Sequence, residues 1–248
     1  MYDFFADSSA IGEKEIIIRG SDVNHMKNVL RLQEGGQVCI HDESTGKEYR
    51  CEIAGYEKDA VHLHIMWAEE ANRELPSKIY LFQGLPKGDK MELIIQKAVE
   101  LGIYEIIPVA TKRAVVKLDA KKAAAKQKRW QSIAESAAKQ SRRNIIPHIH
   151  EVQKFAEAVE DAKELDITLI PYELAEDMEK TKQIFDTIQP GKSIGIFIGP
   201  EGGFDEGEIA LAQEKGISPI TLGKRILRTE TAGMAVLSVL MFQLEGRE

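Results

Sequence analysis

From residue 78 onward, short apolar runs alternate with segments of helical spacing. The runs, KIYLFQGL, EIIPVA, DITLIPYE, SIGIFIGPEGG and ISPITLG, are almost continuously apolar. Strands of this kind are typical of a parallel sheet whose two faces are both covered by helices. We therefore predict an α/β fold for this part of the chain, with a ligand crevice beyond the carboxyl ends of the strands.

Two of the helices between these strands carry clear start signals. Asp89 is placed as the N-cap of the first one, with Glu92 three residues on and Gly102 as its stop. Asp205 and Glu208 repeat the pattern in a later helix. A capping residue followed three positions later by a glutamate is typical of a helix N-terminus, so both helices are expected to begin there.

The first part of the chain has a different pattern. The runs EIIIRG, QVCIHD, KEYRCEIAGY and AVHLHIM are separated by turn residues, which predicts short strands in a small barrel. One helix is expected among them, capped by Ser21 or Asp22 and continuing to Arg31. After a polar connecting stretch the α/β pattern begins, so we predict two domains, 1–72 and 73–248.

Charge is distributed unevenly along the chain. The net charge is -7, yet residues 71–150 hold 16 lysines and arginines against 7 acidic residues. Between residues 112 and 143 there are 11 basic residues, opposed only by Asp119 and Glu135. A local positive field of this kind can attract RNA phosphates although the whole chain is acidic. The alternative is a solvated helix face without a partner.

Several classes of protein are disfavoured by missing patterns. The N-terminus has no basic stretch followed by an apolar run, and no segment has the roughly 20 apolar residues that span a bilayer. Cys39 and Cys51 lie inside strand-like runs without a CxxC pattern, so neither a disulfide nor a zinc site is predicted. We expect a soluble protein of the reducing cytoplasm, without a membrane partner.

The common nucleotide and hydrolase motifs are also missing. There is no GxGxxG after the first strand, and no GxxxxGK[ST], HExxH or GxSxG anywhere. A dinucleotide fold, a P-loop enzyme and a metal-assisted or serine hydrolase are therefore disfavoured. No metal cofactor is expected.

Three loops that follow predicted strands remain as candidates for the site: 171–173, 199–204 and 222–232. The second brings three glycines into five residues, which lets a bare backbone approach a flat ligand closely. The third combines a glycine turn with cations and a carboxylate before an apolar helix. Helix capping explains its threonines and Glu230, but it does not explain three cations together.

These residues carry a resemblance. IGPEGGF (198–204) paired with LGKRILRTETA (222–232) resembles the SPOUT class of methyltransferases, and specifically the RsmE family, which methylates N3 of a uridine in the decoding region of bacterial small-subunit (16S) ribosomal RNA. Further blocks look like segments of that family in the same order. They are HMKNVLRL (25–32), LPKGDKMELIIQKAVELG (85–102), KRAVVK (112–117) and RWQSIAESAAKQSRR (129–143).

The resemblance implies an N-terminal PUA-like RNA-binding barrel and a SPOUT domain whose chain end forms a trefoil knot. It also implies S-adenosylmethionine (SAM) as methyl donor, a homodimer formed through this domain, and 16S ribosomal RNA or the small ribosomal subunit as partner. The chain departs from the family at Asp3 and Phe4, where an arginine is usual, so the RNA contact of that arginine is not expected here.

The knot loops of the family bind SAM, and this places the cofactor on the three loops. Backbone groups around Leu222, Ile226 and Leu227 would hold the adenine, and the first loop would contact the methionine or ribose part. The residues expected to bind the cofactor are Tyr172, Glu173, Leu174, Ile198, Gly199, Pro200, Glu201, Gly202, Gly203, Leu222, Gly223, Ile226, Leu227, Arg228 and Ala232.

Methylation at uridine N3 requires loss of a proton and stabilisation of the negative charge that results. Arg228 is the hypothesis for the stabilising cation, and Glu230 for the base or orienting carboxylate. The alternative for Glu230 is a first-turn carboxylate favoured by the helix dipole.

The residues expected to contact RNA phosphates are Arg31, Lys87, Lys90, Arg113, Arg142 and Arg143. Trp130 could stack on a base, but a tryptophan between apolar helix positions is more often in the core. Other readings of the chain are a SPOUT methyltransferase acting on a ribose 2'-hydroxyl or on transfer RNA, a non-catalytic RNA-binding factor, and a phosphate-metabolising α/β enzyme.

Overall fold

The computed structural model of the chain describes residues 1–248 except 43, 71–72, 174, 176 and 246–248. The chain divides into two compact units, which we call unit 1 (Met1–Glu74 with Ala138–Ile146) and unit 2 (Leu75–Ala137 with Pro147–Glu248). Unit 1 is thus built from two stretches of chain. The domain boundary expected after residue 72 falls at residues outside the described part.

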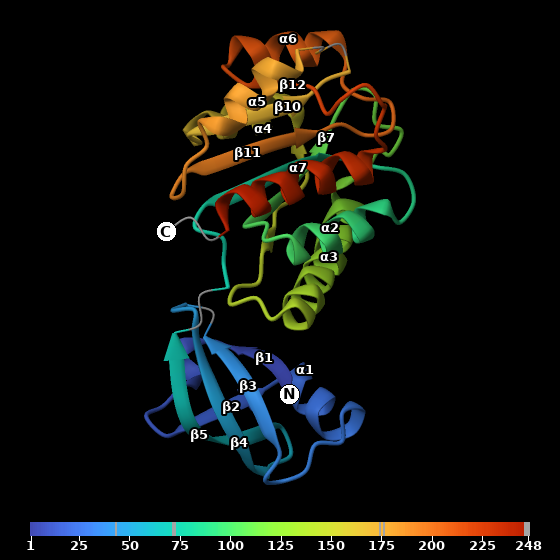
Figure 1. Cartoon of the computed structure of the whole chain (residues 1–248). Coiled ribbons are helices and arrows are strands. Elements are labelled where there is room, and N and C mark those ends of the chain that lie inside the picture. The colour runs from blue at the N-terminus through green and yellow to red at the C-terminus, as the bar shows by residue number, and fades with distance from the viewer. Residues whose placement is uncertain (43, 71–72, 174, 176, 246–248) are drawn as a thin grey trace. The chain divides into compact units, whose positions relative to one another are not determined.

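Unit 1 is a curled five-stranded sheet (Figure 1). Its strand order is β1-β3-β4-β5-β2, with β1 parallel to β3 and the other neighbours antiparallel. Four of the strands were predicted, whereas β1 was not. The strands are β1 (Tyr2–Ala6), β2 (Glu15–Arg19), β3 (Gln37–Asp42), β4 (Lys47–Tyr56) and β5 (Ala60–Glu70).

Alternation along these strands gives the sheet one apolar face, which packs against Val23 and Met26 of the helical segment that follows β2. The prediction for that segment was partly wrong. Gly20, and not Ser21 or Asp22, is the N-cap of α1 (Ser21–Asn24), and the chain continues as a π-helix, η2 (His25–Val29). The helix therefore ends before Arg31, whose φ is +53°. A short 3-10 turn, η1 (Ser8–Ala10), follows β1.

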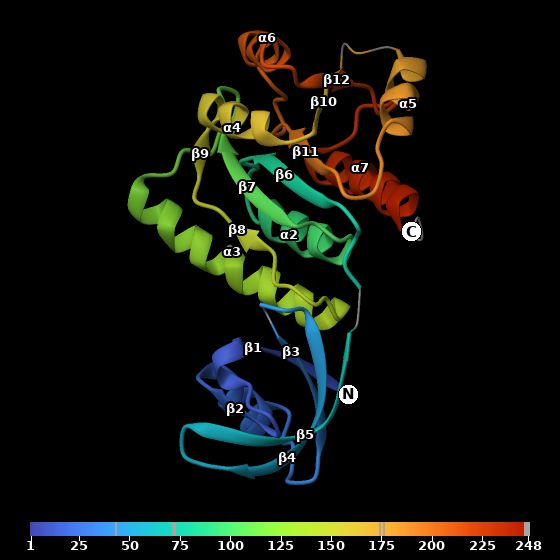
Figure 2. The same cartoon turned by 90° about the vertical axis from the view of Figure 1, so that its left-hand side faces the viewer.

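Unit 2 contains the predicted parallel sheet, in the order β12-β10-β11-β6-β7-β8, with β9 also paired to β7. Figure 2 shows β7 and β12 toward opposite ends of this sheet. All five predicted strands are present, and the two short ones were not foreseen. The strands are β6 (Lys78–Gly84), β7 (Glu105–Ala110), β8 (His148–Ile149), β9 (Gln153–Lys154), β10 (Ile167–Pro171), β11 (Ser193–Ile198) and β12 (Ser218–Ile220).

Helices cover both faces of this sheet, as its continuous apolar strands require. Figure 1 shows α4 and α6 on one face and α2 and α7 on the other. Phe82 and Phe197, stacked with ring centroids 4.3 Å apart, lie in the core under α4 and α6. The helices are α2 (Lys90–Glu100), α3 (Ala120–Ser141), α4 (Phe155–Asp161), η3 (Ala162–Glu164), α5 (Met178–Asp186), α6 (Glu206–Glu214) and α7 (Thr229–Leu244).

The two predicted helix starts differ in their chemistry. At α6 the capping box forms, because the Asp205 side chain accepts from the Gly207 backbone and the Glu208 carboxylate accepts from the Asp205 backbone. Asp89 does occupy the N-cap of α2, but its side chain makes no capping bond, and Glu92 pairs with Arg129 instead. None of the described helices is long and apolar enough to cross a membrane.

Candidate active site

The loops after β10, β11 and β12 meet at one edge of the sheet, because these neighbouring strands are parallel and end on the same side. Together they enclose a pocket of about 930 Å³, within the range of ligand sites in proteins. Thirteen of the residues expected to bind a cofactor line it. They are Tyr172, Glu173, Ile198, Gly199, Pro200, Glu201, Gly203, Leu222, Gly223, Ile226, Leu227, Arg228 and Ala232.

One described residue of that prediction does not line the pocket. Gly202 is absent from the lining and packs instead against the Arg113 backbone, where a Cβ would lie 3.2 Å from the carbonyl oxygen. Leu174 lies outside the described residues. The first loop is nevertheless fixed at its start, because the Tyr172 amide donates to the Ile220 carbonyl at the end of β12.

The turn after β11 depends on its glycines. Gly203 has a φ of +66°, and a Cβ at Gly199 would lie 3.2 Å from the Gly203 backbone. The β6 strand approaches the same turn so closely that a Cβ on Gly84 would lie 2.6 Å from Pro200 Cδ. Side chains are thus excluded on steric grounds, and the turn presents its backbone to the pocket.

A chain of hydrogen bonds joins the two glycine-bearing loops. The Thr229 hydroxyl, at the start of α7, donates to the Gly199 carbonyl over 2.6 Å. Gln83 of β6, fully buried, donates through Nε2 to the Thr229 hydroxyl over 3.0 Å and also to the Gly84 carbonyl. The loop after β11 and the loop after β12 are therefore held together by Thr229 and the buried Gln83.

A second link is ionic. Lys90 Nζ lies 2.8 Å from Glu201 Oε1 and 3.6 Å from Glu230 Oε2. Glu201 also accepts from the Lys87 backbone. Although partial burial opposes ionisation of Glu201, the hydrogen bond from Lys90 holds the pKa of this carboxyl below its ordinary value, and the same bond raises the pKa of Lys90. Lys90 lines the pocket, so its charge acts there.

Of the two residues expected to carry the chemistry, Arg228 lines the pocket and Glu230 is absent from its lining. Arg228 is the N-cap of α7 and is exposed, so its guanidinium is available to a ligand. Glu230 is in the first turn of α7, with 15% of its side chain exposed. This is the position that the helix dipole favours for a carboxylate, and the nearby Lys90 adds a second reason for its placement.

The sequence prediction missed several lining residues. The sequence analysis explained Thr229 by helix capping and Lys90 by a phosphate contact. Nothing local to either residue indicates its partners in the pocket. Lys224 and Arg225 line the pocket as well, which accounts for the cations that capping left unexplained. The other unpredicted lining residues are Pro171, Ala175, Met178, Phe204 and Thr221.

The residues expected to contact RNA have different environments. Arg31, Lys87, Arg113 and Arg142 are exposed, and the Arg142 backbone, like that of Arg31, is left-handed with a φ of +57°. Arg143, in contrast, is 4% exposed and pairs with Glu74 inside unit 1.

Trp130 is 3% exposed, which confirms its place in the core and leaves no face for a base.

The chain was compared with protein-family models and with known proteins. Residues 73–241 match an RNA methyltransferase domain, and residues 18–66 match an RNA methyltransferase PUA domain. The chain is 42% identical to ribosomal RNA small subunit methyltransferase E of Bacillus subtilis, over 92% of this chain and 90% of the relative. Its identity to the protein of that name from Mesomycoplasma hyopneumoniae is 35%, over 96% of this chain and 98% of the relative.

Among solved structures, the chain resembles ribosomal RNA small subunit methyltransferase E from Neisseria gonorrhoeae bound to S-adenosyl methionine. The TM-score is 0.84 and the identity 31%, with 98% of each chain covered. Both the α/β domain and the PUA domain expected from the sequence are thus matched in their expected order. The chain belongs to the RNA methyltransferase family, and within it to the RsmE family of ribosomal RNA small subunit methyltransferases.

Proposed function

We propose that this chain transfers the methyl group of SAM to N3 of a uridine in the decoding region of 16S ribosomal RNA. The observation that carries the proposal is the junction of the two glycine-bearing loops, where Thr229 binds the Gly199 carbonyl beside a pocket of suitable size. The relative from Neisseria gonorrhoeae, similar over the whole chain, was solved with S-adenosyl methionine bound.

The pocket fits SAM in its chemistry. Backbone groups at Leu222, Ile226 and Leu227 would hold the adenine, and Tyr172 and Glu173 would contact the methionine or ribose part. When bound, SAM supplies an electrophilic methyl group, whose transfer needs mainly an in-line approach at about 3 to 3.5 Å. Positioning by the loops is therefore most of the protein's task.

The acceptor imposes two further requirements, because uridine N3 carries a proton at neutral pH. Arg228 would stabilise the negative charge that spreads onto the flanking carbonyl oxygens. Glu230 would accept the proton or orient the base. Lys90 lies between Glu201 and Glu230, so we assign it to holding these two carboxylates in place, in addition to its proposed phosphate contact.

RNA would be held by exposed cations at Arg31 and Arg142 in unit 1 and at Lys87 and Arg113 in unit 2. These contacts would anchor phosphates while the target uridine leaves its stack. We leave Arg143 out of this set because a buried guanidinium paired with Glu74 does not reach a phosphate. We retain residues 1–72 as the RNA-binding domain and 73–248 as the methyltransferase domain.

We also propose that the chain acts in the cytoplasm as a homodimer and that its C-terminal segment is knotted. Exposed apolar side chains support the dimer: Ile226 is 88% exposed, Phe242 85% and Val239 51%. Such side chains are typical of an interface. Phe242→Glu should convert the dimer to a monomer in sedimentation velocity, and a wild-type monomer would contradict the proposal.

The experiment that tests the function is a methyl-transfer map. Purified protein is incubated with labelled SAM and with small subunits that lack the modification, and the label is located by nuclease digestion and mass spectrometry. We expect it at N3 of one uridine in the decoding region. Label on a ribose hydroxyl would replace the proposed acceptor. Failure to bind SAM in calorimetry would instead leave a non-catalytic RNA-binding factor.

A further inference from the structure

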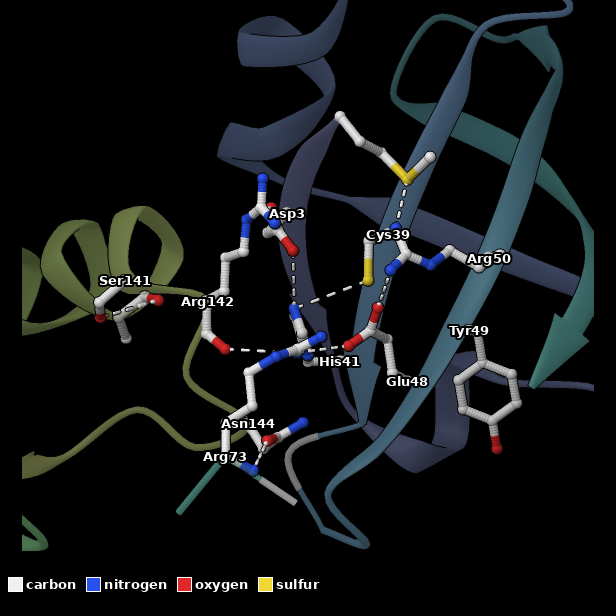
Figure 3. Close-up of polar contacts among 12 residues, drawn as sticks. Asp3, Cys39, His41, Glu48, Tyr49, Arg50, Arg73, Ser141, Arg142 and Asn144 are labelled. Atoms are coloured by element: carbon white, nitrogen blue, oxygen red, sulfur yellow. Dashed lines mark hydrogen bonds and ion pairs between the residues drawn. The ribbon is translucent and has the colours of Figure 1, made fainter. Parts of the chain in front are cut away.

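The polar face of the unit 1 sheet brings together metal-ligating side chains from distant positions. Alternation along β3 puts Cys39 and His41 on the same face, opposite the apolar core. The parallel register pairs Asp3 of β1 with Cys39, and the antiparallel register pairs Glu48 of β4 with His41. A carboxylate, a thiol and an imidazole therefore point toward one another (Figure 3).

The distances between the ligand atoms fit one small cation. His41 Nε2 lies 3.1 Å from Asp3 Oδ1 and 3.7 Å from Cys39 Sγ, and all three atoms lie within 4.8 Å of one another. In a tetrahedral zinc site the ligand atoms are about 3.3 to 3.6 Å apart, given metal bonds of about 2.0 to 2.3 Å. Small side-chain adjustments would close these atoms around zinc.

Burial separates this cluster from an ordinary group of surface acids. Cys39 and His41 are fully buried, and 9% of the Asp3 side chain is exposed. Within the part of the chain that the structure describes, His41 Nδ1 is buried without a hydrogen-bond partner. The two ring nitrogens of an imidazole point in different directions, so His41 faces Asp3 and Cys39 through Nε2 alone.

Three arginines surround the cluster, but they contact its outer side. Arg142 Nε lies 3.9 Å from Asp3 Oδ2, whereas the other oxygen of Asp3 faces His41. Arg50 and Arg73 both contact Glu48, as Figure 3 shows. Arginines placed in this way orient carboxylates, as groups behind metal ligands commonly do, and leave Asp3 Oδ1 facing the inside of the cluster.

We propose that Asp3, Cys39 and His41 form a zinc site in unit 1, with Glu48, the register partner of His41, as a further oxygen donor. Binding joins Asp3 Oδ1, Cys39 Sγ and His41 Nε2 to the metal and releases the thiol proton to solvent. The site ties β1 to β3, so its role is structural and does not depend on the methyl transfer proposed for unit 2.

Cobalt substitution tests the site directly. The full chain is stripped with a chelator and titrated with Co²⁺, which gives a near-ultraviolet charge-transfer band when a thiolate binds. We expect one equivalent to produce the band and Zn²⁺ to displace it. Cys39→Ser should remove the band. Cys51→Ser, a change of the other buried cysteine of the same sheet, should leave it intact.

Thermal unfolding supplies the second measurement. ZnCl₂ should raise the unfolding midpoint of the wild type and of Cys51→Ser, but not that of Cys39→Ser. Should Cys39→Ser fail to fold, the isosteric Asp3→Asn replaces it and should weaken Zn²⁺ binding about tenfold or more. The proposal is overturned if the wild type gives no thiolate band, if Cys39→Ser keeps the band, or if Asp3→Asn binds Zn²⁺ as the wild type does.

Discussion

Two groups of charged side chains, one in each unit, are placed in opposite ways. In unit 1, Glu48 and His41 are fully buried on one face of a sheet, with partners supplied by neighbouring strands and by Arg73. In unit 2, Arg225 and Arg228 lie exposed on a loop at the open edge of a sheet. Buried pairs hold a fold together, whereas exposed charges at strand ends stay available to ligands. We therefore expect changes in unit 1 to alter stability and changes at the pocket to alter activity.

Arg228→Ala is the change at the pocket with the largest expected effect. Methyl transfer should fall about 10² to 10³-fold, because the change removes a cation aimed at charge that develops only during the reaction. The unfolding midpoint should stay near that of the wild type, since the side chain is exposed. Both are measured on the same preparation, by label incorporation and by calorimetry.

Lys192→Ala is the matched control, because Lys192 is an exposed cation at the opposite end of β11. It should keep wild-type turnover. Full activity in Arg228→Ala would remove the proposed role of that arginine and with it the contrast between the units.

Glu48→Gln is the corresponding change in unit 1. Removing this charge leaves Arg50 and Arg73 without their buried partner. Both arginines keep part of their side chains in solvent, 23% and 34%, so the loss should be about 2 to 3 kcal/mol, below the range for fully buried pairs. Urea unfolding is followed in the Trp130→Phe background, where Trp67 reports on unit 1.

Glu69→Gln controls for the loss of charge. Glu69 lies 3.7 Å from Arg50, with 48% of its side chain exposed, and should contribute under about 0.5 kcal/mol. Affinity for SAM should be unchanged in both variants. An equal loss of unfolding free energy in the two variants would show that burial does not determine how much Glu48 contributes to stability.

The sequence predicts the pocket of unit 2 better than the polar face of unit 1. The pocket was largely visible in the sequence, since parallel strands end at one edge and glycine turns after them are local signals. The residues that hold the pocket loops together could not be predicted from the sequence. Gln83 sits inside an apolar strand, and nothing nearby along the chain indicates that its amide meets Thr229, far away in sequence.

The polar face of unit 1 could not be predicted at all. It depends on β1, a strand that the sequence pattern did not reveal, and on the register that sets Asp3 beside Cys39. Arg143 shows the same limit, because a run of basic residues does not say which of them finds a buried partner such as Glu74. Local patterns predict elements and loops, whereas pairing across strands is decided by the tertiary fold.

Thr229→Val tests the hydrogen bonds that support the pocket. The change keeps the shape of the side chain but removes its hydrogen bond to the Gly199 carbonyl and the acceptor for Gln83. A neutral hydrogen bond contributes about 0.5 to 1.5 kcal/mol, so SAM should bind about 2 to 13-fold more weakly in calorimetry. Thr231→Val, an exposed position two residues on, should bind SAM normally.

The smallest effect is expected from His62, a half-buried side chain of unit 1 that pairs with two exposed glutamates. Its Nδ1 lies 2.6 Å from Glu15 and its Nε2 3.1 Å from Glu57. The hydrogen bond to Glu15, helped by the charge of Glu57, raises the pKa of His62 above its ordinary value of 6.5. The stabilisation is therefore fully present below pH 6.5 and is lost as the pH rises through the folded-state pKa. The difference in unfolding free energy between wild type and His62→Gln should therefore shrink with rising pH in urea unfolding. A difference that grows with pH would mean that the protonated imidazole is not the form of His62 that stabilises unit 1.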